Sequence, residues 1–197
     1  NETLIKLAAA QRGGGQLQDA ADSLERLVAA NPTDVLAMTE LADIFIDLEA
    51  HGDAEQHLRR AIALAPTVPG LHGKLGYVLL CQNSITESIE ATGTELQRNP
   101  GVPDLLINYG YALLADDQSA EAVAKFKEAV RHAPDSASAW SGYGVALVRE
   151  HRQEEALPHL RKAVDLEPEN TVSLFYLASG LRATANYEDA ASIYRRG

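Results

Sequence analysis

Histidine and cysteine are the residues of this chain best suited to metal binding or nucleophilic chemistry, and their spacing favours neither. The single cysteine, Cys81, cannot form a disulfide within the chain. His51 and His57 are six residues apart, which places them on different sides of a turn and a helix. No cysteine–histidine pattern has the spacing of a zinc site. The other histidines are His72, His132, His151 and His159. We therefore expect no catalytic residue and no metal site.

Two further features could hold a ligand. The run Gly13-Gly14-Gly15 lacks the Lys-Ser/Thr that follows a phosphate-binding loop, and it follows no strand. It suits a turn between two helices instead. Trp140 could stack against a ligand, but its place in the repeat described below favours packing. We therefore expect no cofactor.

Five prolines follow one another at a constant interval of 34 residues. They are Pro32, Pro66, Pro100, Pro134 and Pro168. A fixed period of this length is typical of stacked repeat arrays. Such an array offers a long surface built from successive repeats rather than one deep pocket. We therefore expect function to lie on that surface rather than at single residues.

The residues between the prolines repeat the same size classes. If each proline is numbered position 32, the repeats start at residues 1, 35, 69, 103, 137 and 171. Position 8 is always alanine or glycine, position 20 is alanine or serine, and positions 7, 11 and 24 are mostly large and apolar. Small residues at a crossing let two helix axes approach to ~8–10 Å, and the proline ends the second helix. The pattern predicts two antiparallel amphipathic helices in each repeat.

The fifth repeat carries the residues of a known family in order. They are Trp140, Tyr143, Gly144, Leu147, Ala156, Leu160, Ala163 and Pro168. This set resembles the tetratricopeptide repeat (TPR) family, and the resemblance covers the whole chain. It implies an all-α fold, a right-handed superhelical solenoid of antiparallel helix pairs. We expect residues 1–197 to form a single TPR array of six units, the last of them truncated.

Composition limits the classes of partner. The net charge is −11, whereas phosphate binding needs clustered Lys and Arg, so we expect no nucleic-acid partner. No apolar run reaches the ~18 residues needed to cross a bilayer, so we expect no membrane partner. The acidic surface either keeps the molecule in solution or favours neutral or basic partner segments. The compartment is left open between the cytoplasm and the periplasm.

In the TPR family the first helix of each repeat lines a concave groove, and the resemblance implies that positions 2, 5, 9, 12 and 13 face it. The predicted binding site consists of the apolar residues at these positions in the third to fifth repeats: Tyr77, Leu80, Ile107, Tyr111, Leu114, Val145 and Val148. A contiguous apolar surface usually marks an interaction site. Because Tyr77 and Tyr111 are one repeat apart, we expect them to lie side by side. The alternative is that part of this set packs between repeats.

The third repeat departs from the pattern. Ser88, Thr92 and Glu95 stand where the family has apolar residues, and Gly93 weakens a helix interior by ~1 kcal/mol relative to alanine. A buried Glu95 without a partner would cost more. The sequence therefore predicts that this helix either sits further out than its neighbours or is a soft joint, with simple degeneration of the repeat as the origin.

The end of the chain, Tyr194-Arg195-Arg196-Gly197, lacks the polar final helix that usually closes such an array. We expect either that the natural protein continues or that a second copy covers this end, which would make a homo-oligomer. The whole pattern favours a non-enzymatic protein–protein interaction module that binds a partner peptide or helix in the concave groove. Two alternatives stay open. One is an accessory TPR region of a larger enzyme of glycosyl- or sulfotransferase type, with catalysis outside this chain. The other is a self-assembling scaffold.

Overall fold

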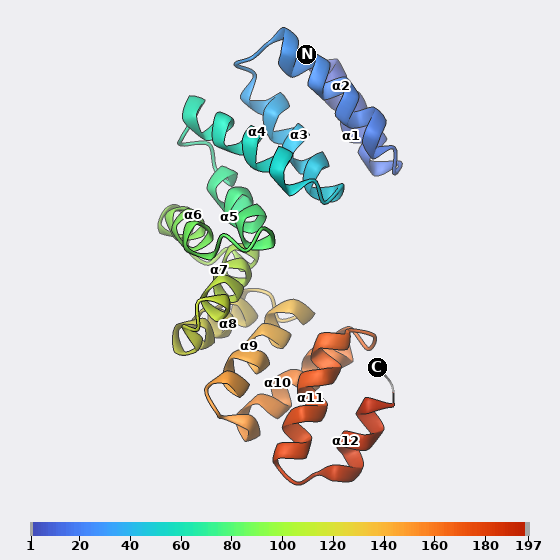
Figure 1. Ribbon diagram of the computed structural model, residues 1–197, viewed down its shortest axis with the longest axis vertical. Helices are drawn as coiled ribbons and strands as arrows, with labels where there is room; N and C mark the ends of the chain where they lie inside the picture. The colour runs from blue at the N-terminus through green and yellow to red at the C-terminus, as the bar shows by residue number, and fades with distance from the viewer. Residues whose placement is uncertain (1, 196–197) are drawn as a thin grey trace. The chain divides into compact units, whose positions relative to one another are not determined.

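The computed structural model describes residues 2–195, which form helices joined by short turns, with no strand in that range. Their bounds are α1 Glu2–Gly13, α2 Leu17–Ala30, α3 Val35–Asp47, α4 His51–Leu64, α5 Leu71–Cys81, α6 Ile85–Arg98, α7 Pro103–Ala115, α8 Ser119–His132, α9 Ala137–Arg149, α10 Gln153–Leu166, α11 Thr171–Ala183 and α12 Tyr187–Tyr194. Consecutive helices form antiparallel pairs (Figure 1). The predicted all-α fold of helix pairs is confirmed.

The contacts within the chain cluster into two compact units. Unit 1 comprises residues 1–95, with α1 to α5 and most of α6. Unit 2 comprises residues 96–197, with α7 to α12. The boundary follows Glu95, inside the helix whose sequence is atypical. That all six repeats form one continuous array stays a prediction.

The last position of a repeat caps the first helix of the next one. The side chain of Asp34 accepts a hydrogen bond from Ala37 N, and Ser136 and Asn170 do the same for the backbone three residues on. Such caps satisfy an amide at a helix start that has no partner inside the helix. At α7 a proline at the first helical position, Pro103, takes the place of a capping side chain.

In every repeat, the residue at position 15, just after the first helix, has a left-handed backbone conformation with a positive φ. In the first repeat this residue is Gly15, with φ of 77°. In the others it is a residue with a side chain, with φ between 56° and 62°: Glu49, Asn83, Asp117, His151 and Ala185. A left-handed residue is the usual way to turn a chain out of a helix. The turn geometry is therefore fixed by the repeat, and only the first repeat uses the residue type that adopts it without strain.

The core of each unit forms where the small residues of positions 8 and 20 bring two helices together. Ala8, Ala20, Ala42 and Ala54 are fully buried in unit 1. In unit 2 glycine at position 8 admits a larger ring, because a Cβ on Gly110 would lie 2.7 Å from the ring of Phe126. The size pattern read from the sequence thus corresponds to real close approaches between helices.

The expectation that α6 sits further out than its neighbours is wrong. Ser88, Thr92 and Glu95 are all buried, and the Ser88 hydroxyl donates to the carbonyl oxygen of Gly76 at 2.7 Å. A Cβ on Gly76 would lie 2.0 Å from Thr92 Oγ1, so α5 and α6 pack closely. Glu95 Oε1 accepts a hydrogen bond from Gly70 N at 2.9 Å. Polar side chains can replace apolar ones here because backbone groups of α5 and its preceding turn partner two of them.

Two predictions concern the ends of the chain. The described residues leave out Asn1, the first residue of the first repeat. They also leave out Arg196 and Gly197, the last residues of the predicted bare end.

None of the helices within residues 2–195 is long and apolar enough to cross a membrane.

Candidate protein-interaction surface

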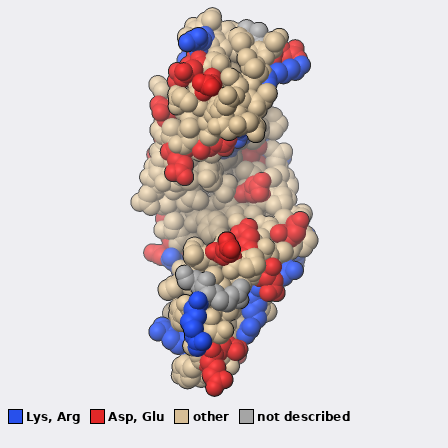
Figure 2. All heavy atoms as spheres, turned by 90° about the vertical axis from the view of Figure 1, so that its right-hand side faces the viewer, with Lys and Arg blue, Asp and Glu red and all other residues tan. Residues whose placement is uncertain are grey.

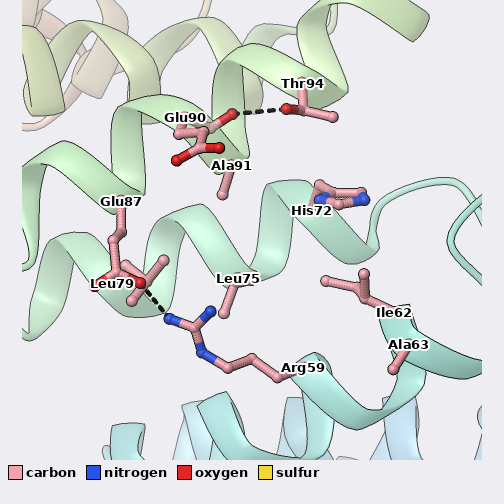
Figure 3. A pocket seen from close by; sticks show the side chains of 10 residues that line it. All are labelled: Arg59, Ile62, Ala63, His72, Leu75, Leu79, Glu87, Glu90, Ala91 and Thr94. Carbon is pink, nitrogen blue, oxygen red and sulfur yellow. Dashed lines mark hydrogen bonds and ion pairs between the residues drawn. The ribbon is translucent and has the colours of Figure 1, made fainter.

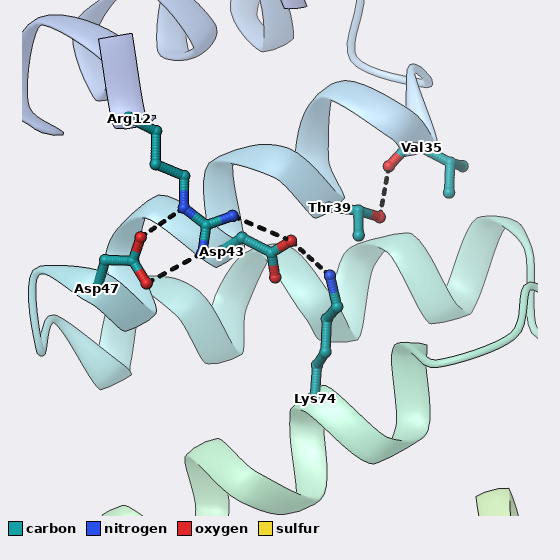
Figure 4. Close-up of polar contacts among 6 residues, drawn as sticks. All are labelled: Arg12, Val35, Thr39, Asp43, Asp47 and Lys74. Carbon is teal, nitrogen blue, oxygen red and sulfur yellow. Dashed lines mark hydrogen bonds and ion pairs between the residues drawn. The ribbon is translucent and has the colours of Figure 1, made fainter. Parts of the chain in front are cut away.

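The first helices of unit 1 carry a charge network (Figure 4), in which Arg12, Asp43 and Asp47 occupy predicted groove positions. The guanidinium of Arg12 in α1 pairs with Asp47 through two hydrogen bonds and lies 3.8 Å from Asp43 Oδ2. Lys74 Nζ in α5 donates to the same Asp43 oxygen at 2.5 Å. The hydrogen bond from Arg12 lowers the pKa of Asp47 below its usual range. Two cations, Arg12 and Lys74, therefore compensate the two carboxylates of Asp43 and Asp47.

Tyr77 and Leu80 extend this face along α5, almost one helical turn apart. The side chain of Tyr77 is exposed, with 37% of its surface accessible, and Leu80 is half-buried. Cys81 lies one turn beyond Tyr77 and is exposed. A hydrogen bond with Cys81 raises the pKa of the Tyr77 hydroxyl. Of the predicted site residues, Tyr77 is the one most accessible to a partner.

Three of the predicted site residues in unit 2 are buried. Ile107, Leu114 and Val145 expose only 8%, 5% and 5% of their surface. These side chains belong to the packing of α7 and α9, as the alternative reading of the sequence allowed. The expected contiguous exposed apolar surface therefore does not include them.

Tyr111 and Val148 are half-buried. The Tyr111 hydroxyl donates to the carbonyl oxygen of Ser138 at 3.1 Å, across the interval from α7 to α9. Its ring meets Phe126 edge-on, with centroids 5.1 Å apart and an interplanar angle of 74°. Tyr111 is thus held by contacts inside unit 2. Because Tyr77 belongs to unit 1, the expectation that the two tyrosines lie side by side stays a prediction.

The predicted site omitted two strongly exposed apolar residues of unit 2. Val172 and Phe175 of α11 expose more than half of their surface, and Phe175 lines a cavity of about 240 Å³ together with Tyr194 of α12. The signal was present in the sequence, because both residues occupy groove positions of the sixth repeat. The ion pairs of Arg12 were not predicted, since they join residues 31 and 35 positions away in the chain.

Charged side chains of both signs are distributed over the face drawn in Figure 2. Within residues 2–195 no group of three His, Cys, Asp or Glu side chains is placed to hold a metal ion.

Comparison with known proteins agrees with the fold. Residues 5–69 and 107–171 match the family described as tetratricopeptide repeat. These stretches cover more than half of the chain, so the protein belongs to the TPR family. They leave out residues 70–106, which contain α5 and α6. No curated protein matches the sequence at a significant level.

Several solved structures share the fold at low sequence identity. PilW, described as a widely conserved type IV pilus biogenesis factor, is 19% identical, with a TM-score of 0.86 over 98% of this chain and 89% of PilW. PilF of Pseudomonas aeruginosa is 19% identical, with a TM-score of 0.83 over 98% of this chain and 87% of PilF. YrrB, described as a TPR protein with an unusual peptide-binding site, is 20% identical, with a TM-score of 0.71 over 87% of this chain and 89% of YrrB.

Proposed function

We propose that this chain is a non-enzymatic protein–protein interaction module that holds a peptide or a helix of a partner against the first helices of its repeats. Membership of the TPR family supports an interaction role, because stacked repeats create extended concave binding surfaces. The likeness to YrrB, a TPR protein with a peptide-binding site, agrees with a peptide as the bound element.

The exposure of Tyr77 is the observation that carries the proposal. A tyrosine offers a large apolar ring and a hydroxyl while losing few rotatable bonds on binding. Here the ring stands exposed on α5, with Leu80 beside it on the same helix. We assign the anchoring contact to these two residues.

The other predicted residues take different roles in this proposal. Tyr111 and Val148 offer the partly accessible apolar surface of α7 and α9. Ile107, Leu114 and Val145 support that surface from beneath, because they are buried. Within unit 2, the surface that the predicted residues leave for a partner is therefore that of Tyr111 and Val148.

Peptide selection from a random library, followed by calorimetry of the selected peptides, tests this assignment. Tyr77→Ala should weaken binding at least about tenfold, since a buried aromatic contact contributes roughly 1.5 kcal/mol or more. Its melting temperature should be nearly unchanged. Tyr187→Ala is the matched control, because Tyr187 is an exposed tyrosine at the start of α12. Equal affinity of the Tyr77→Ala and Tyr187→Ala variants would contradict the proposal.

A further inference from the structure

A cavity of about 350 Å³ lies between α4, α5 and α6 of unit 1 (Figure 3). Leu75 and Leu79 of α5 line it, and Ile62 of α4 and Ala91 of α6 line it from the neighbouring helices. Its volume falls in the range of ~300–1,000 Å³ that small-ligand pockets occupy. The cavity is open to solvent, and apolar side chains share its lining with the polar and charged side chains of Arg59, His72, Glu87, Glu90 and Thr94.

This cavity is separate from the proposed peptide surface. Successive residues of a helix are rotated by ~100°, so Leu75 and Leu79 project from the opposite side of α5 to Tyr77 and Leu80. The cavity and the anchoring residues Tyr77 and Leu80 both lie within unit 1 and share α5 alone. A substitution in one can therefore leave the other intact.

The repeat pattern shows which side chains occupy the cavity-lining positions in another repeat. In the third repeat, positions 4, 7 and 23 are His72, Leu75 and Ala91, which all line the cavity. Two repeats later the same positions carry three rings: Trp140, Tyr143 and His159.

These three rings form one stack in unit 2. The imidazole of His159 lies 4.2 Å from the ring of Tyr143 and 5.4 Å from that of Trp140, centroid to centroid, with interplanar angles of 24° and 14°. The Trp140 Nε1 donates to the carbonyl oxygen of Pro134 at 2.8 Å. The fold thus accepts flat aromatic groups at this position of the repeat. The cavity of unit 1 exists because Leu75 and Ala91 are smaller than their counterparts.

The rim of the cavity is acidic. Arg59 is already engaged, because it donates to Glu55 at 2.6 Å and to Glu87 at 2.5 Å. Glu90 is exposed at the rim and forms no ion pair with any residue between 2 and 195. At the corresponding position of the fifth repeat stands Pro158, so this charge is particular to unit 1. A cation held near Glu90 would complement the rim.

We propose that this cavity is a second binding site, which takes an aromatic side chain of a protein partner with a lysine or arginine next to it in sequence. The ring enters between α5 and α6, where the ring stack of unit 2 has its counterpart, and contacts Leu75, Leu79 and Ala91. The neighbouring basic group pairs with Glu90. The site recognises a short basic-aromatic segment by ring shape and by charge.

The probe for this site is the peptide acetyl-Arg-Trp-Arg-amide, added to the 197-residue chain with labelled methyl groups. Methyl signals of Ile62, Leu75 and Leu79 should shift on titration. Acetyl-Arg-Ala-Arg-amide should bind at least about tenfold more weakly, because the ring supplies the buried area. Acetyl-Glu-Trp-Glu-amide should also bind more weakly, since its charges repel Glu90.

Two variants distinguish the contribution of the ring's shape to binding from the contribution of the charge on Glu90. The triple substitution His72→Trp, Leu75→Tyr and Ala91→His copies the residues of unit 2 and should fill the cavity and abolish binding. Glu90→Gln should weaken binding about two- to fivefold, the range of an exposed ion pair, and it leaves the packing intact because Glu90 is exposed. Circular dichroism confirms that each variant is folded.

Three outcomes would overturn the proposal. The first is a set of peptide-induced shifts that spares Ile62, Leu75 and Leu79. The second is equal binding by the Arg-Trp-Arg and Glu-Trp-Glu peptides. The third is self-association of the chain in sedimentation experiments that the triple substitution abolishes, which would make a second copy the occupant. Tyr77→Ala should leave binding of this probe unchanged, so failure of this site is distinguishable from failure of the proposed function.

Discussion

In the third and fifth repeats, side chains at the same positions have opposite effects: in one they leave a cavity, and in the other they pack together. In the fifth repeat, Trp140, Tyr143 and His159 stack into one packed group. In the third repeat, the smaller Leu75 and Ala91 at the matching positions leave a cavity. The backbone period is the same in both. The comparison teaches that, within one repeat scaffold, side-chain volume decides whether a position supports the fold or is open to a ligand.

The two units also differ in how their helices pack at close range. In unit 1, α5 meets α6 through Ser88 and Thr92, which are polar and fully buried. In unit 2, the ring of Phe126 is fully buried against Gly110 and Gly142. Unit 2 is therefore expected to depend on tight apolar packing, and the end of unit 1 on polar contacts.

The largest expected effect is that of Phe126→Ala. Removing a fully buried phenylalanine should lower the free energy of unfolding of unit 2 by about 3–5 kcal/mol, because transfer and cavity terms add. Trp140 is the single tryptophan and lies in unit 2, so its fluorescence during urea unfolding reports on that unit. A loss below about 1 kcal/mol would contradict the dependence on ring packing.

Gly142→Ala should have the next largest effect. The added Cβ would lie 2.1 Å from the Phe126 ring, and overpacking of this kind costs about 1–3 kcal/mol. The same Trp140 fluorescence measures it. Combining the change with Phe126→Leu should recover part of the loss. Gly52→Ala in unit 1 is the control, because nothing lies within 4 Å of its added Cβ, and circular dichroism during urea unfolding compares both variants.

Thr92→Val tests the polar contact of unit 1. Thr92 Oγ1 is buried and has no hydrogen-bond partner among the described residues. Its replacement by a methyl group of similar size should raise the free energy of unfolding by about 1 kcal/mol. Ser88→Ala should lower it by about the same amount, because the Ser88 hydroxyl donates to Gly76 O. Circular dichroism during urea unfolding measures both, and stabilisation by Ser88→Ala would argue against this account.

The smallest expected effect is a dependence of stability on pH, with one histidine in each unit. Burial lowers the pKa of His57 and of His159 below the usual value of ~6.5. Below that value the unfolded chain binds more protons than the folded chain, so stability should decrease as the pH falls from 7 towards 5. Replacing each histidine by glutamine should flatten the curve, measured by circular dichroism for His57 and by Trp140 fluorescence for His159. An unchanged slope in both variants would exclude these two groups as its source.

The fold could be predicted from the sequence because the period of 34 residues and the small residues at positions 8 and 20 are local features. The exposure of the predicted site residues could not be predicted from the sequence. Ile107 and Val145 occupy groove positions, yet neighbouring helices cover them. The packing of α6 was predicted wrongly, because a sequence does not show that Gly70 N can partner Glu95 or that Gly76 O can partner Ser88. The cavity was missed since it depends on residue volumes on three helices together.

Asp43 joins three repeats, since it belongs to the second and contacts Arg12 of the first and Lys74 of the third. The stability of a repeat array is approximated by the stability of each repeat plus terms between nearest neighbours. Both ion pairs of Asp43 are terms between adjacent repeats, so this one carboxylate couples the second repeat to each of its neighbours. Salt, which screens ion pairs, should therefore weaken both couplings together.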